Sequence, residues 1–324
     1  MPSDNEKVFV VSLHRTMTRS TDALLSMLGY ETMHHPKYFR GHNLQESIRG
    51  IEDQPEKIMD ILRPVIESAD AFGDVPFPAL YRYLAQEWPN SKFLLIQRDP
   101  ESWVKSVRNH LGDKKLTPFN LTQYYPYLGR KIERLSDISD QYLLDMYNQH
   151  ITEVKEFFTR KNEMWRLCVL DVQDQYLGEK ISGFLGKSPV KFPVIKGKGT
   201  DPALLGEWIE MSPFKADPHY FLADIYYNQG LLSDADLECN KAIDLDPYNP
   251  KPYKLLYHIN KKKQCFFEAC FAAEQAVNLG MQNSRLSFKA SIGNFFKGRL
   301  GKGIKHFFRS LKLQWKSFRG IKGK

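Results

Sequence analysis

The chain has 324 residues, of which 42% are hydrophobic and 13% aromatic, and it carries 46 Lys and Arg against 38 Asp and Glu. At about 100–200 residues per domain this length predicts two domains, and the composition excludes a mainly disordered chain. The longest apolar runs are far shorter than the roughly 20 residues that cross a bilayer, so we expect no transmembrane segment. The polar first residues predict no secretory signal, and four cysteines are too few for a disulfide framework, so we expect a cytoplasmic protein.

The net charge of +8 is concentrated at one end of the chain. Residues 285–324 carry twelve Lys and Arg and no acid, which leaves 34 bases and 38 acids in the other 284 residues. The chain is therefore a mildly acidic body with a basic end. No nucleic-acid recognition motif accompanies this charge, so we expect no nucleic-acid partner. The alternatives are a solvated polar cap, or docking onto an acidic protein or an anionic membrane surface.

Strand and helix patterns alternate over the first 187 residues. Buried strands are predicted at residues 7–13, 71–75, 92–97 and 165–172. Helices are predicted between and after them, at residues 20–28, 44–51, 57–68, 77–88, 100–109, 138–158 and 176–185. This alternation predicts an α/β fold, a parallel sheet with helices on both faces. A stretch rich in Gly, Pro and Lys at 186–202 indicates a linker, so we expect one domain over 1–200 and a second over 201–324.

The second domain repeats with a period of 34 residues, counted from Ala216, Pro250 and Ser284. Small residues recur at the twentieth and twenty-seventh positions of each repeat, as Ala235 and Ala242, Ala269 and Ala276, and Gly303 and Ser310. Small side chains at fixed positions let paired helices approach closely, and the pattern resembles tetratricopeptide repeats. It predicts an all-α repeat domain with a divergent third repeat. Apolar spacing in that repeat predicts inward-facing side chains at Phe288, Phe295, Ile304, Phe307 and Phe308.

A polar turn follows the first strand and precedes the first helix. Residues 13–21 read Leu-His-Arg-Thr-Met-Thr-Arg-Ser-Thr, with two guanidinium groups and four hydroxyls, and Ser20 or Thr21 is the expected N-cap. Such a turn gathers backbone N–H groups and a helix N-terminus around one point, which suits a phosphate or sulfate. Arginine suits a planar anion with several oxygens. The alternative is a solvated turn, and the GxxxxGK[ST] pattern is absent.

A second candidate anion site begins where the strand at 92–97 ends. Arg98 follows that strand, and Ser106 lies eight residues later, about two turns into the next helix. At the carboxyl edge of a parallel sheet, where α/β folds bind ligands, these two side chains are expected to meet on one ligand. The alternative is a helix capped by Asp99 beside an ordinary surface arginine.

Together these two segments resemble the cytosolic-type sulfotransferases that use 3′-phosphoadenosine 5′-phosphosulfate (PAPS). That family carries a loop of the form P-[KR]-[ST]-G-T-T, then an arginine at a strand end and a serine eight residues on. The run from Arg15 to Thr18 and the pair Arg98 and Ser106 match those positions. The resemblance covers residues 7–195. Two departures are Met17, where the family usually has Gly, and Arg19, where it usually has Thr.

The resemblance implies a P-loop-like α/β fold and a metal-free transfer of a sulfuryl group from PAPS to a small-molecule acceptor, with PAP as product. The residues it implies for donor binding are His14, Arg15, Thr16, Met17, Thr18, Arg19, Ser20, Arg98 and Ser106. It implies that Arg15 also acts in catalysis. The candidates for the general base are Asp74 first, then His35 and His34, with a helix N-cap as the alternative role of Asp74.

The sequence also fits other functions. Met17 and Arg19 favour a weakly active or inactive sulfotransferase-fold scaffold that works through its repeats and binds an acidic protein partner. A kinase-like phosphate enzyme is disfavoured by the missing Walker lysine. Tyr124, Tyr125 and Tyr127 lie in a stretch expected to be a loop, 113–130, and either line an acceptor pocket or belong to the core.

Overall fold

The structure is a computed structural model that describes residues 6–129, 132–281, 283–296, 302, 305–306 and 310. The chain forms two compact units. The first comprises Met1–Lys37 and Leu44–Ile195, and the second comprises Tyr38–Asn43 and Lys196–Lys324. No helix among the described residues is both long enough and apolar enough to cross a membrane.

The first unit is built on a five-stranded sheet in the order β2-β5-β1-β6-β7, and every neighbouring pair is parallel. Its strands are β1 (Val8–Val10), β2 (Thr32–His34), β5 (Ala71–Gly73), β6 (Lys92–Gln97) and β7 (Leu167–Asp171). The predicted parallel sheet is confirmed. Sequence analysis missed β2, because its three residues Thr-Met-His carry no alternating apolar pattern.

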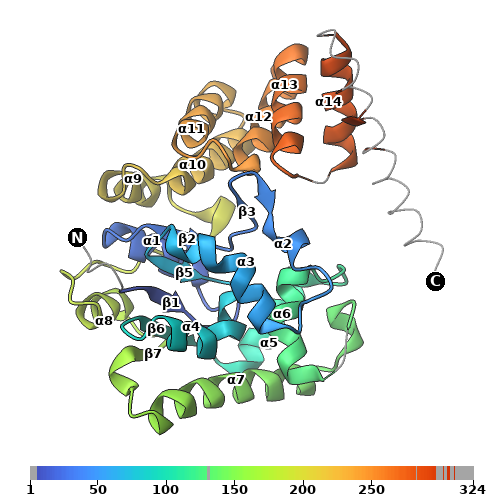
Figure 1. The fold of residues 1–324 in the computed structure, drawn as a ribbon. Coiled ribbons are helices and arrows are strands. Elements are labelled where there is room, and N and C mark those ends of the chain that lie inside the picture. The colour runs from blue at the N-terminus through green and yellow to red at the C-terminus, as the bar shows by residue number, and fades with distance from the viewer. Residues whose placement is uncertain are drawn as a thin grey trace. The chain divides into compact units, whose positions relative to one another are not determined.

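Helices cover both faces of this sheet (Figure 1). They are α1 (Thr18–Met27), α2 (Leu44–Ser47), α3 (Pro55–Glu67), α4 (Tyr81–Glu87), α5 (Pro100–Leu111), α6 (Pro118–Leu128), α7 (Asp140–Arg160) and α8 (Leu177–Phe184). On one face Val10 packs in a cluster with Leu24 of α1 and Ile181 of α8. On the other, the ring of Phe93 lies 5.5 Å from Phe9 and 4.8 Å from Phe158 of α7. Successive strand residues alternate between the faces, so both are buried.

The stretch expected to be a loop at 113–130 contains a helix instead. At the start of α6, the Thr117 hydroxyl accepts a hydrogen bond from the Asn120 amide, and the Asn120 side chain accepts one from the Thr117 amide. Pro118 occupies the first helical position, where its missing N–H costs nothing. This reciprocal cap, which uses Asn in place of the usual Glu or Gln, initiates the helix that sequence analysis overlooked.

The second unit is a series of helices together with a short antiparallel hairpin from earlier in the chain. The hairpin pairs β3 (Tyr38–Phe39) with β4 (His42–Asn43). Its helices are α9 (Pro202–Met211), α10 (Ala216–Gln229), α11 (Leu232–Leu245), α12 (Pro250–Lys262), α13 (Phe266–Asn278) and α14 (Ser284–Phe296). Helices α10, α12 and α14 begin at the three positions that the 34-residue period predicts. The α/β domain followed by helical repeats is thus the fold that the sequence predicted.

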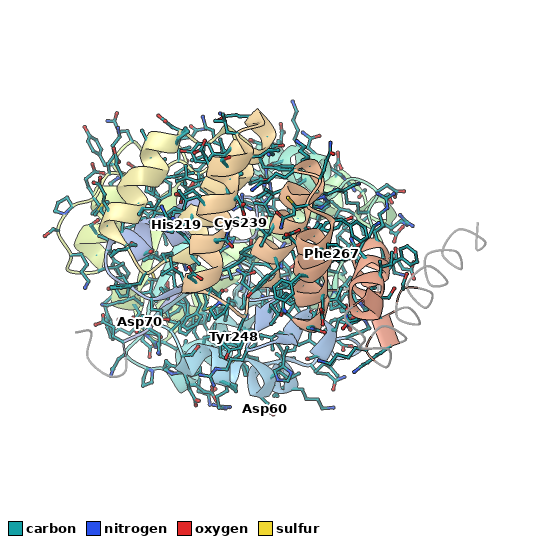
Figure 2. The ribbon with its side chains drawn as sticks, turned by 90° about the horizontal axis from the view of Figure 1, so that it is seen from above. Asp60, Asp70, His219, Cys239, Tyr248 and Phe267 are labelled. Atoms are coloured by element: carbon teal, nitrogen blue, oxygen red, sulfur yellow. The ribbon has the colours of Figure 1, made fainter. Side chains whose placement is uncertain are left out.

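The repeat helices pack through their small residues. Ala235 and Ala242 of α11 and Ala276 of α13 have no exposed surface. Between α10 and α11, His219 Nδ1 lies 2.6 Å from Glu238 Oε2, and the buried Cys239 follows on α11; His219 and Cys239 are labelled in Figure 2. The small positions of the repeat thus serve the close helix pairing that the sequence predicted.

One packing prediction in the third repeat is wrong. Phe288 is 44% exposed, because α14 instead buries Leu286, Ala290 and Asn294, which are spaced four residues apart on another face. Of the other predicted inward residues, Ile304, Phe307 and Phe308 lie outside the described residues, and the side chain of Phe295 is not among those described.

Candidate active site

The candidate residues gather at one edge of the first unit because all five strands are parallel and end on the same side. The loop after β1 carries Arg15. His34 is the last residue of β2, Asp74 follows β5, and Arg98 follows β6. Residues 91 positions apart in the sequence can therefore meet at this edge.

The loop after β1 reaches α1 through two residues in the left-handed region. Arg15 has φ 70° and Met17 has φ 63°. A glycine adopts this conformation without the steric cost that a Cβ brings, so Met17 occupies a glycine-like backbone position with a side chain in place. The family pattern noted above has Gly at this point.

Helix α1 begins earlier than expected, at Thr18, and Met17 is its N-cap without a side-chain hydrogen bond. Neither predicted cap acts as one. The Ser20 hydroxyl accepts a hydrogen bond from the Ile195 amide, and the Thr21 hydroxyl donates to the Met17 carbonyl. The first N–H groups of a helix have no intrahelical acceptor, so the start of α1 presents donors and a positive dipole end at this loop.

Arg15, Arg98 and Ser106 form one cluster. Arg15 Nε donates to Ser106 Oγ at 3.2 Å, and Arg98 Nη1 donates to the Arg15 carbonyl at 3.2 Å. Arg98 Nε also donates to Ser102 Oγ at 3.0 Å. Partial burial and the neighbouring charges of Arg98 and Arg19 lower the pKa of Arg15. Guanidinium groups crowded together in this way destabilise one another, and a bound anion relieves that repulsion.

A second cluster joins Asp74, His34 and Thr18. Asp74 Oδ2 lies 3.4 Å from both Thr18 Oγ1 and His34 Nε2, and Asp74 Oδ1 accepts a hydrogen bond from the Val75 amide at 2.7 Å. Burial opposes ionisation of this carboxyl group, but the nearby histidines and the Val75 amide hold the pKa of Asp74 at about 2. The Asp74 side chain is thus engaged in this cluster, and the N-cap of the short 3-10 helix that follows is Pro76.

The other candidate histidines have ring contacts of their own. The ring of His35 packs edge-on against Phe119 at 5.5 Å. The imidazole of His14 is 4% exposed, with Nε2 2.8 Å from the Tyr124 hydroxyl, and burial lowers its pKa to about 4. His14 therefore contributes its backbone to the loop, with its carbonyl accepting from Trp103 Nε1 at 2.9 Å.

The remaining loop residues differ in where their side chains lie. The hydroxyl of Thr16 is buried and donates to the Leu13 carbonyl at 2.6 Å, so Thr16 stabilises the turn itself. Arg19 is exposed, and Ser20 and Thr18 are buried. Among the residues that the structure describes, no group of three or more His, Cys, Asp or Glu side chains could hold a metal ion.

Sequence analysis missed the buried side chains of α6 and α7 that hold the backbone near the ends of β1 and β6. His150 of α7 donates from Nε2 to the Val11 carbonyl at 2.8 Å, and Tyr127 of α6 lies 2.7 Å from His150 Nδ1. The Tyr147 hydroxyl bonds the amide of Arg98 at 2.7 Å and its carbonyl at 2.9 Å. Tyr124 has no exposed surface, so it belongs to this support and not to an open pocket. No local motif marks these residues, since only tertiary packing brings them to the loop.

These features define a class of protein. A parallel sheet with a glycine-like turn and a helix N-terminus after its central strand is the plan of α/β domains that bind a phosphorylated ligand at the carboxyl edge. A family model described as "Sulfotransferase domain" matches residues 7–199, more than half of the chain. The chain belongs to this sulfotransferase family, as the resemblance in its sequence predicted. None of the curated proteins compared with the chain matches it.

Several solved structures share similarity with the chain. YrrB, described as a TPR protein with an unusual peptide-binding site, matches at 20% identity and a TM-score of 0.30, over 35% of this chain and 58% of that one. MamA matches at 15% identity and a TM-score of 0.33, over 56% of this chain and 98% of that one. The type III secretion translocator chaperone SycD of Yersinia enterocolitica matches at 21% identity and a TM-score of 0.25, over 36% of this chain and 84% of that one.

The first of these matches spans less than two thirds of the YrrB structure. All three TM-scores are below 0.5, so the repeat architecture rests on the 34-residue period and the helix pairs of the chain itself.

Proposed function

We propose that this protein transfers a sulfuryl group from PAPS to a hydroxyl or amine of a small-molecule acceptor. Membership of the sulfotransferase family supports the transfer. The observation that supports PAPS as donor is the meeting of Arg15, Arg98 and Ser106, which come from segments 83 and 91 residues apart. PAPS carries two separate anionic groups, and two arginines that project from neighbouring strand ends suit such a ligand.

The residues present fit this donor. The start of α1 and Arg15 suit the 5′-phosphosulfate, because they combine backbone donors with a guanidinium group. Arg98 and Ser106 suit the 3′-phosphate, since both side chains can donate hydrogen bonds and the Tyr147 hydroxyl holds the backbone of Arg98. When bound, PAPS supplies the sulfuryl group and leaves as PAP.

Sulfuryl transfer depends on alignment and charge stabilisation more than on covalent protein chemistry. Arg15 would stabilise the negative charge that builds on the bridging oxygen as the bond to sulfur breaks. The cluster of Asp74, His34 and Thr18 would lie on the acceptor side and receive its proton. A cytoplasmic location is part of this proposal, and the four cysteines, all free thiols, suit a reducing compartment.

Calorimetric titration with PAP tests the proposal. We expect micromolar binding by the wild-type chain and much weaker binding by Arg98→Ala. Preference for ATP over PAP would favour a phosphate-handling enzyme. Failure to bind either nucleotide would favour the alternative of a scaffold that acts through its repeats.

One observation favours that alternative: Met17 places a side chain at a backbone position suited to glycine, where a phosphate would approach closely. In that case the repeat unit carries the function, and the twelve Lys and Arg of residues 285–324 support an acidic protein partner. A pull-down at low and high salt, with full-length chain and with chain ending at Leu313, would test such a partner.

A further inference from the structure

Sequence analysis ranks Asp74 and His35 ahead of His34 as candidate bases. In the structure, Asp74 is paired with His34. His34 ends β2 and Asp74 follows β5, the neighbouring strand, whose Gly73 is the register partner of His34. His34 Nε2 lies 3.4 Å from Asp74 Oδ2 and 3.2 Å from Thr18 Oγ1. The pair results from the sheet pairing itself, and β2 is the strand that sequence analysis missed.

The hydrogen bonds around His34 determine which ring nitrogen carries the proton. The Thr18 hydroxyl donates to Asp74 Oδ2, so its oxygen is left to accept. The Asp74 carboxylate can only accept while it is ionised. His34 Nε2 therefore faces two acceptors and carries the hydrogen in the neutral ring. Its Nδ1, with no hydrogen-bond partner among the described residues, keeps its lone pair free.

The other histidines of the region have different ring contacts. His14 and His150 are buried, each with a ring nitrogen bonded inside the core, and burial lowers the pKa of both to about 4. The ring of His35 packs against Phe119. The side chain of His34 is 16% exposed, and its Nε2 lies 3.4 Å from the Asp74 carboxylate. A low pKa of about 2 leaves Asp74 itself a poor proton acceptor near neutral pH.

We propose that His34, oriented through Nε2 by Asp74 and Thr18, is the proton acceptor of the site and that Nδ1 receives the proton. This inference rests on the proposed sulfotransferase function and deepens it. Asp74 becomes a positioning residue that also stabilises the imidazolium, as the carboxylate does in a hydrolase triad. Thr18 links this base to the loop that holds the donor, since it is the first residue of α1.

The step balances in atoms and charge. The acceptor oxygen or nitrogen forms a bond to sulfur with one electron pair as its proton passes to His34 Nδ1. The bond between sulfur and the bridging oxygen breaks, and its electron pair leaves on PAP. The site ends with an imidazolium paired to the Asp74 carboxylate. Other titratable groups also interact electrostatically with Asp74. They are His14 and Arg15 of the loop after β1, His35 after β2, His110 of α5 and Tyr124 of α6.

A ligand-free NMR measurement tests the pair without any assumption about the reaction. The ring-nitrogen signals of neutral His34 should show the hydrogen on Nε2, and this preference should weaken in Asp74→Ala, which removes the carboxylate acceptor. His42, which is exposed, serves as an internal reference whose ring signals should not change in the variant. A hydrogen on Nδ1 in the wild-type chain, or the same preference in Asp74→Ala, would overturn the proposal.

Kinetics with PAPS and a generic phenolic acceptor test the role in proton transfer. Gln keeps a side-chain N–H for Asp74 but cannot act as a base, so His34→Gln should lower kcat by about 10²–10⁴-fold and remove the acid limb of the pH–rate profile. PAP affinity should change less than twofold. The matched control is His42→Gln, which should retain full activity. If His34→Gln keeps kcat within threefold of wild type, His34 is not the base, whereas loss of PAP binding by the wild-type chain would reject the sulfotransferase function itself.

Discussion

Arg15 Nε donates a hydrogen bond to Ser106 Oγ across 3.2 Å, although the two residues are 91 positions apart in the chain. The bond joins the loop after β1 to α5, and Arg98 ties the same loop from β6 through the Arg15 carbonyl. Two segments that sequence patterns single out separately therefore form one basic cluster at the carboxyl edge. The first two predictions follow from this convergence.

Arg15→Ala should lower kcat at least a hundredfold, because a preorganised charge at the leaving group is typically worth about 3–4 kcal/mol in the transition state. The measurement is sulfuryl transfer under saturating PAPS. Arg15→Lys is the matched control. It keeps the charge but loses the planar fork, so we expect an intermediate rate. Near-normal turnover in Arg15→Ala would remove Arg15 from this role.

Arg98→Ala should weaken PAP far more than it weakens an analogue without the 3′-phosphate. The expected loss for PAP is about 1.5–3 kcal/mol, the usual range for a hydrogen bond to a charged group. Calorimetry with both ligands gives the comparison. The exposed Lys105 on the same helix as Ser106 provides the control variant, Lys105→Ala, which should bind both ligands like the wild type. Equal losses for the two ligands would mean that Arg98 supports the loop and does not recognise the 3′-phosphate.

The parts of the site that sequence predicts best are those encoded locally. The strand ending before Arg98 and the helix bearing Ser106 follow from an apolar run, a capping Asp99 and a proline at the first helical position. The 34-residue period places three repeat helices at their first residue, because the close packing of small residues is repeated in the sequence itself.

The parts that sequence predicts poorly depend on contacts between distant segments. The Asp74–His34 pair requires β2 to lie beside β5, and a three-residue strand gives too few positions for a pattern. Burial of His14 against Tyr124 depends on α6, whose cap uses Asn120. A residue's type can indicate chemistry, but its partner is set by packing.

Met17 tests the cost of a side chain in the left-handed region. Met17→Gly should change the free energy of unfolding by less than about 1 kcal/mol, since relief at φ 63° is offset by the greater entropy of glycine in the unfolded chain. Met17→Val should destabilise by about 1–3 kcal/mol, because a β-branched residue fits this region worst. Urea denaturation measures both. Equal stability of the Val variant would contradict the backbone conformation of the loop.

The free energy of unfolding should begin to fall below about pH 6.5, before most carboxyl groups become protonated. His14 and His150 have folded-state pKa values of about 4 because burial opposes their charge, against an ordinary value of 6.5. The unfolded state therefore binds protons more tightly than the folded state. The contribution of these neutral histidines to stability is fully present above pH 6.5 and is lost as the pH falls toward 4. Each histidine accounts for about 3 kcal/mol over this window.

The variant His150→Gln isolates one of these two contributions. Gln can still donate to the Val11 carbonyl but cannot be protonated, so its loss of stability between pH 6.5 and pH 4 should be smaller than that of the wild type by about 3 kcal/mol. His42→Gln replaces an exposed histidine and serves as the control variant. The same acid sensitivity in His150→Gln and wild type would show that His150 is not held neutral by burial.

Two glycines of α8 offer a matched pair for the packing behind the sheet. A Cβ at Gly178 would lie 2.5 Å from the Phe192 amide nitrogen and closer still to the Val190 carbonyl oxygen, whereas a Cβ at Gly183 would meet nothing within 4 Å. Val190 and Phe192 pack against the cluster formed by β1, β6 and α1, so they cannot move away without opening that cluster.

Gly178→Ala should therefore destabilise the protein by about 1–3 kcal/mol. Gly183→Ala should be neutral or stabilise by up to about 1 kcal/mol, because alanine favours the helix and nothing opposes it. Urea midpoints of the two variants, compared with wild type, give the result, and equal midpoints would show that residues 190–192 do not pack against α8 as described.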